Sequence, residues 1–444
     1  MRKTPLRRGL LVAVALGAVA APALATPALA APKPASETSE ERVVAGLERH
    51  AHPLRGTRPD TPGHDLKALS ALVRDAEIVG IGEATHGSKE LFTLRHRLFR
   101  HLATTQGFTT LALEAPWSAG VRLDEYVRTG KGDLRTILKE EGETTGGVWS
   151  TEEWLDLYSW MRDYNRTART KLRVMGFDLS DVHPQQYRRI LDWAEEHEPS
   201  ILPELRRRYA KLLALPGGAK ERVDALTALP PERLKAVAED AEAAYHLVEK
   251  AAKVDPYVLQ EARVIHQMTK VYASEGSELH LNRDRFMAEN TMWWKRQTGL
   301  KIVAAAHNGH VTYLSPFPQH YPVTQGARLR AMAGRSYVAI GTSIHSGGFR
   351  AINPDNGKAE NFDTGVAGPD SNEHILDKVR HRDYYVSLRQ AERDPATRKW
   401  LGTARPTFTV PATYLPDMLK APLALGQAYD IVVHLHRVKA ADPL

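Results

Sequence analysis

The chain has 444 residues, of which 42% are hydrophobic and 25% are charged, and this composition is ordinary for a soluble globular protein. Its formal charge of +7 is too small to indicate nucleic-acid binding, and the sequence has no RNA-binding or DNA-binding motif. Cysteine is absent, which excludes disulfides, a thiol nucleophile and thiolate metal sites.

The first thirty residues have the pattern of an export signal. Four basic residues precede an apolar segment over 9–21, and two Ala-Leu-Ala sites suited to cleavage follow at 23–25 and 28–30. The apolar segment is shorter than the roughly 20 residues that a transmembrane helix needs. We therefore expect a signal peptide over 1–30 and a secreted, extracellular protein without stable membrane insertion. Removing those four basic residues lowers the charge from +7 to about +3.

Residues 31–65 are expected to contain a linker rich in Pro, Ala, Ser and Thr, followed by an N-terminal helix over Val43–His50. Strand and helix patterns then alternate over 66–186. We interpret this segment as the first part of an α/β core, because such alternation is typical of parallel βαβ units. The expected strands are Glu77–Gly82, Thr109–Glu114 and Leu172–Phe177, and the expected helices are Leu66–Ala76 and Ser88–Thr105.

Helical patterns replace the strands over 187–299. In the clearest of them, Asp255 stands in the N-cap position and Pro256 is the first helical residue. We expect this insertion to form a helical cap over one end of the sheet and to set the choice of substrate; a helical subdomain with a purely structural role is the alternative. The expected helices are Pro203–Ala214, Pro230–Ala252, Pro256–Tyr272 and Arg283–Arg296.

Short strands return over 300–444, which we interpret as the second part of the core. The predicted fold class is therefore α/β, with a parallel-sheet core flanked by helices and a helical cap insertion. The expected elements of this part are the strands Lys301–Ala306, Ser336–Thr342, Asp383–Leu388 and Tyr429–His436 and a helix over Asn372–Val379.

Four of the expected strands end next to an ionisable residue: Glu83, Glu114, Asp178 or His307. Because the carboxyl ends of parallel strands meet at the same edge of a sheet, we expect these side chains to face one pocket. If the strands that lead to His86 and Glu114 are neighbours, their ends lie roughly 5 Å apart. A histidine flanked by carboxylates is held in one tautomer and is suited to take a proton from water, which predicts hydrolysis.

Three motifs in this order resemble the erythromycin esterase family. They are Gly-Glu-Ala-Thr-His-Gly over 82–87 followed by Arg95, Leu-Glu-Ala-Pro over 113–116, and Ala-His-Asn-Gly-His-Val over 306–311. The resemblance implies an enzyme that hydrolyses a carboxylic ester or a macrolactone, and it implies functional positions where the motifs match. These positions are Glu83, His86, Arg95, Glu114 and His307.

The resemblance also suggests what each group does. His86 corresponds to the base that deprotonates water, Glu83 and Glu114 would orient and polarise it, and Arg95 with His307 would stabilise the tetrahedral intermediate. Further residues are expected to line or brace the pocket, namely Asp178, Arg283, Asn308 and His310. Family members that confer antibiotic resistance act on macrolides inside the cell, so for an exported chain other lactones and esters are equally open as substrates.

Several other chemistries lack their motif, since no dinucleotide fingerprint, P-loop, G-x-S-x-G elbow or H-E-x-x-H occurs. We expect a small-molecule substrate, no nucleic-acid partner and no cofactor. Two alternatives stay open. The cluster of Glu83, His86, Glu114 and His307 offers ligands for zinc or manganese, which would make the protein a metal-dependent hydrolase. A secreted protein that binds a ligand or haem without catalysis is the second alternative.

Overall fold

The computed structural model describes residues 38–143, 147–416 and 419–444, and Ser39–Leu444 form one compact unit. The expected signal peptide over 1–30 and the linker before residue 38 lie outside the described residues. Among the described residues, no helix combines the length and the apolar character needed to cross a membrane.

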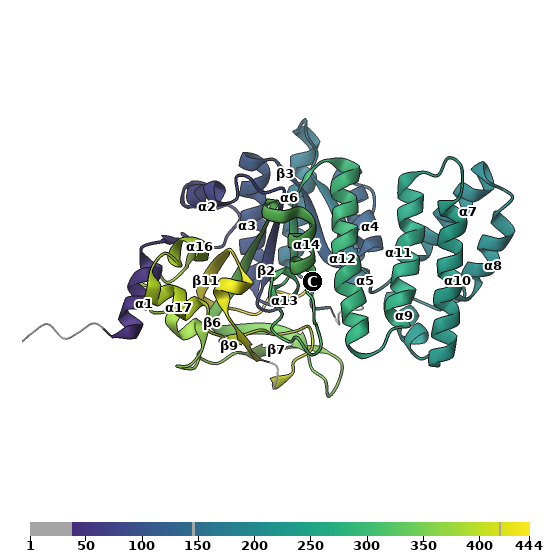
Figure 1. Cartoon of the computed structure of the whole chain (residues 1–444). Helices are drawn as coiled ribbons and strands as arrows, with labels where there is room; N and C mark the ends of the chain where they lie inside the picture. Colours follow the sequence, from purple (N-terminus) through teal and green to yellow (C-terminus); the bar gives the residue numbers. More distant parts are fainter. Residues whose placement is uncertain (1–37, 144–146, 417–418) are drawn as a thin grey trace, which may run out of the picture. The chain divides into compact units, whose positions relative to one another are not determined.

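A nine-stranded mixed sheet forms the centre of this unit (Figure 1). Its order is β1-β8-β11-β6-β2-β5-β3-β4, and β7 pairs with β6. The six strands from β11 to β4 are parallel to one another, so the predicted parallel core is confirmed, while β1, β7 and β8 add antiparallel pairs. The strands are β1 (Ala51–Pro53), β2 (Ile78–Glu83), β3 (Phe108–Pro116), β4 (Arg173–Asp178), β5 (Lys301–His307), β6 (Tyr337–Ile352), β7 (Ala359–Asp363), β8 (Tyr384–Ser387) and β11 (Ile431–Val438).

Helices cover both faces of the sheet, and alternate residues of each parallel strand enter opposite cores. In β2, for example, Ile78 packs into one core and Val79 into the other, as expected for a strand buried on both faces. A separate antiparallel pair, β9 (Arg405–Phe408) and β10 (Lys420–Leu423), lies outside this sheet.

The helices on the face that contains Val79 include α2 (Lys67–Leu72), α3 (Lys89–Gln106), α5 (Leu134–Gly142) and α6 (Glu152–Thr167), and α4 (Trp117–Thr129) packs against β4. The remaining helices, apart from those of the 187–299 segment, have at most ten residues each. They are α1 (Ser39–Glu48), α13 (Asn308–Val311), α14 (Gln325–Ala333), α15 (Asn372–Leu376), α16 (Leu388–Ala391), α17 (Pro395–Leu401) and α18 (Leu425–Ala428), with 3-10 turns at Gly63–Leu66 and Gly334–Ser336.

The segment over 187–299 is helical throughout, as expected. It contains α7 (Pro184–His197), α8 (Leu202–Leu213), α9 (Ala219–Thr227), α10 (Pro231–Glu249), α11 (Pro256–Tyr272) and α12 (Gly276–Thr298). The predicted cap of α11 is confirmed, because the Asp255 carboxylate accepts hydrogen bonds from the backbone N–H groups of Tyr257 and Val258. Figure 1 shows α7 to α11 grouped beyond α12, which packs against β4 and β5. Of this segment, α12 is therefore the part that lies next to the strand ends.

The strands that lead to His86 and Glu114 are not neighbours, so the spacing of adjacent strands does not apply to their ends. β5 lies between β2 and β3, and its terminal His307 stands level with Glu83 of β2. Consecutive strands often pair, but here β5, which ends at His307, 193 residues after Glu114, lies between β2 and β3. Local sequence gives no signal for this insertion.

Helix α4 approaches the edge strand β4 through two glycines. A Cβ at Gly120 would lie 1.9 Å from the backbone nitrogen of Gly176, and a Cβ at Gly176 would lie 2.0 Å from the carbonyl oxygen of Pro116. Neither backbone atom can move without displacing a strand. The close contact holds β4, and with it Asp178, against the sheet.

Replacing Gly120 with Ala should therefore lower the free energy of unfolding by about 1–3 kcal/mol, because the added methyl group overpacks this contact. Urea unfolding followed by circular dichroism measures the change. Gly402→Ala is the matched control, since a Cβ there meets no atom closer than 3.3 Å. Equal stability of Gly120→Ala and the wild type would show that α4 does not need this contact.

Candidate active site

The predicted site residues converge at the carboxyl ends of the parallel strands. Glu83 ends β2, Glu114 lies near the end of β3, Asp178 ends β4 and His307 ends β5, while His86 lies in the turn after β2. All five are buried, with exposed fractions between 1% and 8%. The strand order makes β5 the centre of the arrangement, so that Glu83 and Glu114 stand on either side of His307.

Glu83 connects His86 to Arg95. The Nδ1 atom of His86 lies 2.6 Å from Oε1 of Glu83, and Arg95 of α3 forms an ion pair with Oε2 of the same carboxylate. An ionised carboxylate only accepts hydrogen bonds, so Nδ1 of His86 carries the proton and Nε2 is left as the acceptor. Arg95 also lies over the indole ring of Trp154, with its guanidinium carbon 5.2 Å from the ring centroid. The side chain of Arg95 thus extends from α3 back to the end of β2.

Glu114 is held by three donors. Its Oε1 accepts from Arg283 of α12 at 3.0 Å and lies 3.2 Å from Nε2 of His310, and its Oε2 accepts from the backbone N–H of His307 at 2.7 Å. Burial by itself would raise the pKa of this carboxyl, but His310, through its charge and its hydrogen bond, and then His86 and Arg283 hold it well below its usual value. Glu114 is therefore ionised at neutral pH. Arg283 extends the network to Asp178 with hydrogen bonds of 2.9 Å and 2.6 Å.

His310 is a buried cation between two carboxylates. Its Nδ1 lies 2.6 Å from Asp284, and its Nε2 faces Glu114. Burial opposes the charged form, but Asp284 and Glu114 raise the pKa of His310 to about 10. A guanidinium nitrogen of Arg283 also lies 3.1 Å from Nε2 of His310. Both are donors when His310 is charged, so neither accepts from the other, and the carboxylate of Glu114 accepts from both. His310 thus stabilises the charge of Glu114.

His307, unlike His310, is uncharged. Burial, followed by the proximity of His86, lowers the pKa of His307 to about 3, so this imidazole is neutral. Its Nδ1 accepts a hydrogen bond from the backbone N–H of Gly309 at 3.1 Å, which leaves the proton on Nε2. The hydroxyl of Thr409 lies 3.4 Å from Nε2, and the imidazole also forms a hydrogen bond with the backbone of Ala84. The rings of His307 and His86 lie 4.9 Å apart, so an N–H donor stands beside the histidine that can accept a proton.

Asn308 does not line the cavities at the strand ends. Its side-chain amide donates to the carbonyl of Thr342 at 2.7 Å and accepts from the N–H of the same residue at 3.1 Å. It thereby joins the end of β5 to β6, and a Cβ at Gly82 would meet its Oδ1 atom at 2.2 Å. Of the two expected roles, lining or bracing the pocket, these contacts correspond to bracing, because both polar atoms of the amide are used within the fold.

Two adjoining cavities open onto these groups. The larger, the outer cleft, has a volume of about 460 Å³ and is bounded by site residues together with His280 of α12 and the loops over 316–321 and 411–415. The smaller measures about 190 Å³ and includes Trp149, Asp178 and Ser180. His86, Glu114, Arg283 and Ala412 line both.

Sequence reasoning missed three aromatic residues of these walls. Trp149 meets His86 edge-on with ring centroids 5.4 Å apart, and His280 packs on Tyr321 at 4.0 Å. None of them belongs to a motif at a strand end, and their positions follow only from how loops and α12 fold over the sheet. No signal in the local sequence indicates them.

Both carboxylates of the proposed metal-ligand set form ion pairs with arginines, which would compete with binding of a metal ion. Glu83 pairs with Arg95 and Glu114 pairs with Arg283. Among the described residues, no group of three His, Asp or Glu side chains is arranged as a metal ion requires. The zinc or manganese alternative stays a hypothesis for experiment.

Comparisons with known proteins agree with the motifs. The family model described as erythromycin esterase matches residues 103–438. The chain is 26% identical over 341 residues to erythromycin esterase type II of Escherichia coli, which covers 68% of this chain and 77% of that protein.

Two crystal structures share the fold across almost the whole chain. One is a protein from Bacillus cereus with a TM-score of 0.82 and 31% identity, covering 90% of this chain and 98% of that one. The other is described as a succinoglycan biosynthesis protein and has a TM-score of 0.80 and 26% identity, with 91% and 98% covered. The central sheet flanked by helices is therefore a shared architecture.

The buried cation of His310 should make stability depend on pH. A pKa raised from 6.5 to about 10 stabilises the fold fully below pH 6.5, and this contribution is lost as pH rises toward 10. We expect the gap in urea midpoint between the wild type and His310→Gln to be largest near pH 6 and to shrink at pH 8 and 9.5. His64→Gln, at an exposed site, is the control. A gap that stays constant with pH would show that His310 is not charged.

Proposed function

This chain belongs to the erythromycin esterase family, and we propose that it hydrolyses a carboxylic ester or macrolactone by attack of a water molecule that His86 activates. The family supports a hydrolase of the esterase kind. The observation that carries the mechanism is the buried pair of His86 and Glu83, whose atoms Nδ1 and Oε1 lie 2.6 Å apart beside the outer cleft.

In the first step, Nε2 of His86 takes a proton from a water molecule in the cleft. Glu83 accepts the hydrogen bond from Nδ1, which fixes the tautomer and favours the imidazolium that forms. Arg95 holds Glu83 in place from α3. The hydroxide attacks the ester carbonyl carbon and forms a tetrahedral intermediate. A general base of this kind contributes about 10²–10⁴-fold to a rate.

In the second step, the intermediate expels the alcohol. The neutral His307 donates Nε2–H to the oxyanion, while the ionised Glu114 stabilises the imidazolium of His86 through space. The C–O bond of the ester breaks, and His86 returns its proton to the leaving alkoxide. One water is consumed, and a carboxylic acid and an alcohol are released, with His86 restored.

We further propose that the protein acts outside the cell, on the basis of the export pattern over 1–30. Its substrate is then an ester or lactone that it meets after export, and macrolides form one candidate class because of the relative from Escherichia coli. The loops over 316–321 and 411–415, together with α12, shape the outer cleft and would discriminate among such substrates.

Replacing His86 with Asn should lower kcat/KM at least a hundredfold on any ester or lactone that the wild type hydrolyses, because the general base is lost. Hydrolysis of a panel of macrolides, simple esters and lactones by the purified protein measures this. His64→Asn, at an exposed site, is the control and should keep full activity. Near wild-type turnover by His86→Asn, with its circular dichroism unchanged, would contradict the mechanism.

Exhaustive chelation separates this mechanism from the metal alternative. We expect hydrolysis to survive chelation in a sample whose metal content is measured and negligible, because the proposed base and oxyanion donor are protein groups. Activity that is lost on chelation and restored by zinc or manganese would instead make Glu83, His86, Glu114 and His307 candidate ligands. Absence of activity on every ester and lactone would favour a binding protein.

A further inference from the structure

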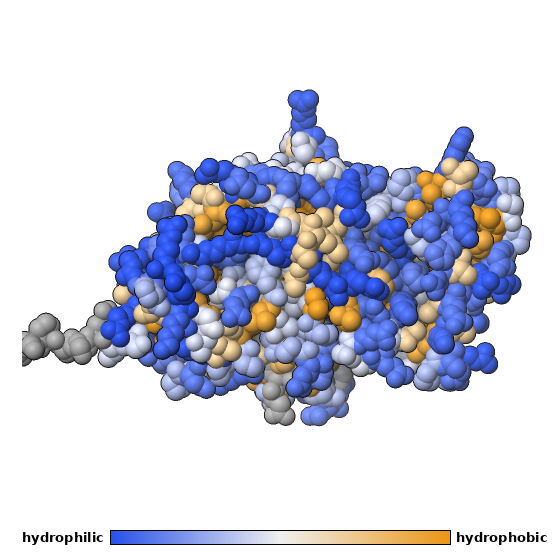
Figure 2. Space-filling view, in the orientation of Figure 1, coloured by the Kyte–Doolittle hydropathy of each residue, from blue (hydrophilic) through white to orange (hydrophobic). Residues whose placement is uncertain are grey.

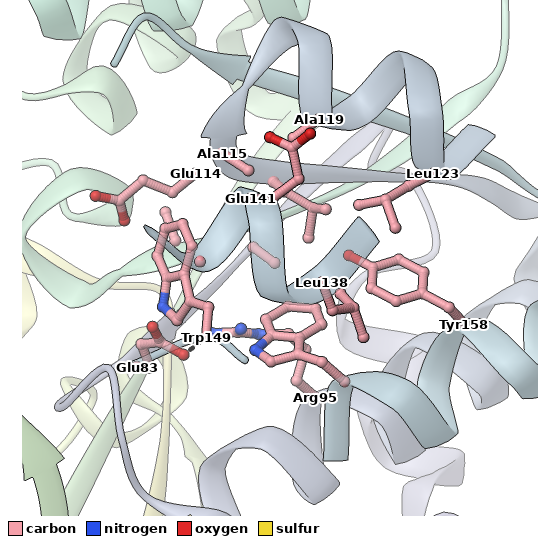
Figure 3. A pocket seen from close by; sticks show the side chains of 15 residues that line it. Glu83, Arg95, Glu114, Ala115, Ala119, Leu123, Leu138, Glu141, Trp149 and Tyr158 are labelled. Atoms are coloured by element: carbon pink, nitrogen blue, oxygen red, sulfur yellow. Dashed lines mark hydrogen bonds and ion pairs between the residues drawn. The ribbon is translucent and has the colours of Figure 1, made fainter. Parts of the chain in front are cut away.

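A third cavity, here called the inner chamber, lies behind the strand-end carboxylates. It measures about 40 Å³ and is bounded by β3, β5, α4, α5 and α6. In Figure 3, Glu83 and Glu114 lie at one side of it, and Leu123 and Tyr158 lie at the opposite side. Apart from the charged groups, its walls are apolar: Leu113, Ala115, Ala119, Leu123, Leu138, Trp154, Tyr158, Ala305 and Ala306.

The inner chamber adjoins the place where the chemistry is proposed to occur. Trp149 and Glu114 line both the chamber and the 190 Å³ cavity, and the Trp149 ring contacts His86. Arg95 and Glu83 also face the chamber. A group that extends from a carbonyl carbon beside His86 therefore has an apolar space next to the cavity that it occupies.

The sizes of the two spaces decide which half of an ester faces inward. Arg283 and His310 line the outer cleft, and Arg95, which is paired with Glu83, lines the chamber, so the cations favour neither side. The alkoxide leaves toward the outer cleft, where the space is about tenfold larger. The acyl half then points into the chamber.

We propose that the inner chamber is the acyl-binding site, and that the protein prefers esters whose acid part is a short, unbranched aliphatic chain. This inference rests on the proposed esterase function. A volume of about 40 Å³ holds roughly three water-sized groups, which corresponds to a chain of about three or four carbons including the carbonyl.

Unpaired donors at the chamber support a ligand there. The Nε–H of Arg95 and the indole N–H groups of Trp149 and Trp154 have no acceptor within the described part of the chain. Arg95 and Trp154 are only 3% and 6% exposed, and buried donors normally have partners. After cleavage, the second oxygen of the product carboxylate supplies an acceptor for these donors.

The expected signature is a sharp dependence on acyl chain length. Each methylene that enters an apolar site should raise kcat/KM about fourfold. The gain should stop when the chamber is full, and longer chains should lose activity because they overfill a packed interior. Kinetics on p-nitrophenyl esters from acetate to octanoate measure this, and we expect an optimum at propionate or butyrate.

Two substitutions in the chamber should move this optimum in opposite directions. Leu123→Phe reduces the space, so the optimum should shift to acetate, whereas Leu138→Ala enlarges it, so the optimum should shift to hexanoate. Leu415→Phe changes the outer cleft instead and is the matched control, for which the optimum should stay where it is. Circular dichroism and thermal unfolding establish that each variant is folded. Opposite shifts cannot arise from a general loss of stability.

A binding measurement separates this inference from the esterase proposal. Straight-chain amides of two to eight carbons carry the same acyl groups, and calorimetry gives their affinities for the wild type and the chamber variants. An unchanged chain-length profile in both variants, with ester hydrolysis intact, would overturn the acyl site alone. If no ester is hydrolysed, the esterase proposal fails. Amide binding that stops at the predicted chain length would still support the acyl site in the chamber. Amide binding that does not depend on chain length, or no amide binding, would overturn the acyl site.

Discussion

The ion pair between Glu83 and Arg95 is the constraint on which the site depends. Glu83 is 1% exposed and Arg95 is 3% exposed, so neither charge has access to water. Removing one partner from such a pair leaves an uncompensated buried charge, which typically costs about 3–5 kcal/mol. The same rule applies to Glu114, whose cations come from α12 and from α13. Helices α3 and α12 are thereby tied to the sheet by the charges that define the site.

These pairs also separate the protonation states of two histidines at one strand end. His307 and His310 are three residues apart, yet the pKa of the first falls to about 3 and that of the second rises to about 10. The cause is the neighbour set: His307 is buried beside another imidazole, whereas His310 lies between two carboxylates. Groups whose environments drive their pKa values apart are suited to different tasks, here a neutral N–H donor and a fixed cation.

Much of this arrangement follows from local sequence. The apolar runs that became β2 to β5 and the Asp255–Pro256 start of α11 were predictable, because burial on both faces and helix capping depend on adjacent residues. Their polar ends indicated where Glu83, Glu114, Asp178 and His307 would gather. The sequence does not indicate which residues far apart in the chain come into contact. Arg283 contacts Asp178 and Glu114, which precede it by 105 and 169 residues, and β5 enters the sheet between two strands that precede it in the chain. No local period encodes such pairings.

The residues proposed to react and the residues proposed to select the substrate lie in different kinds of structure. The groups proposed to react lie at the ends of parallel strands or in the turn after one, where strand pairing such as that of Glu83 with His307 fixes the backbone. The walls that meet the substrate are different in kind, since the outer cleft is built from α12 and two loops and the inner chamber from side chains of α4, α5 and α6. The two loops, and helix positions other than Arg283, can change without disturbing the buried ion pairs. Homologues that keep the strand ends can therefore differ in substrate, which is why family membership defines the type of reaction more closely than the molecule that undergoes it.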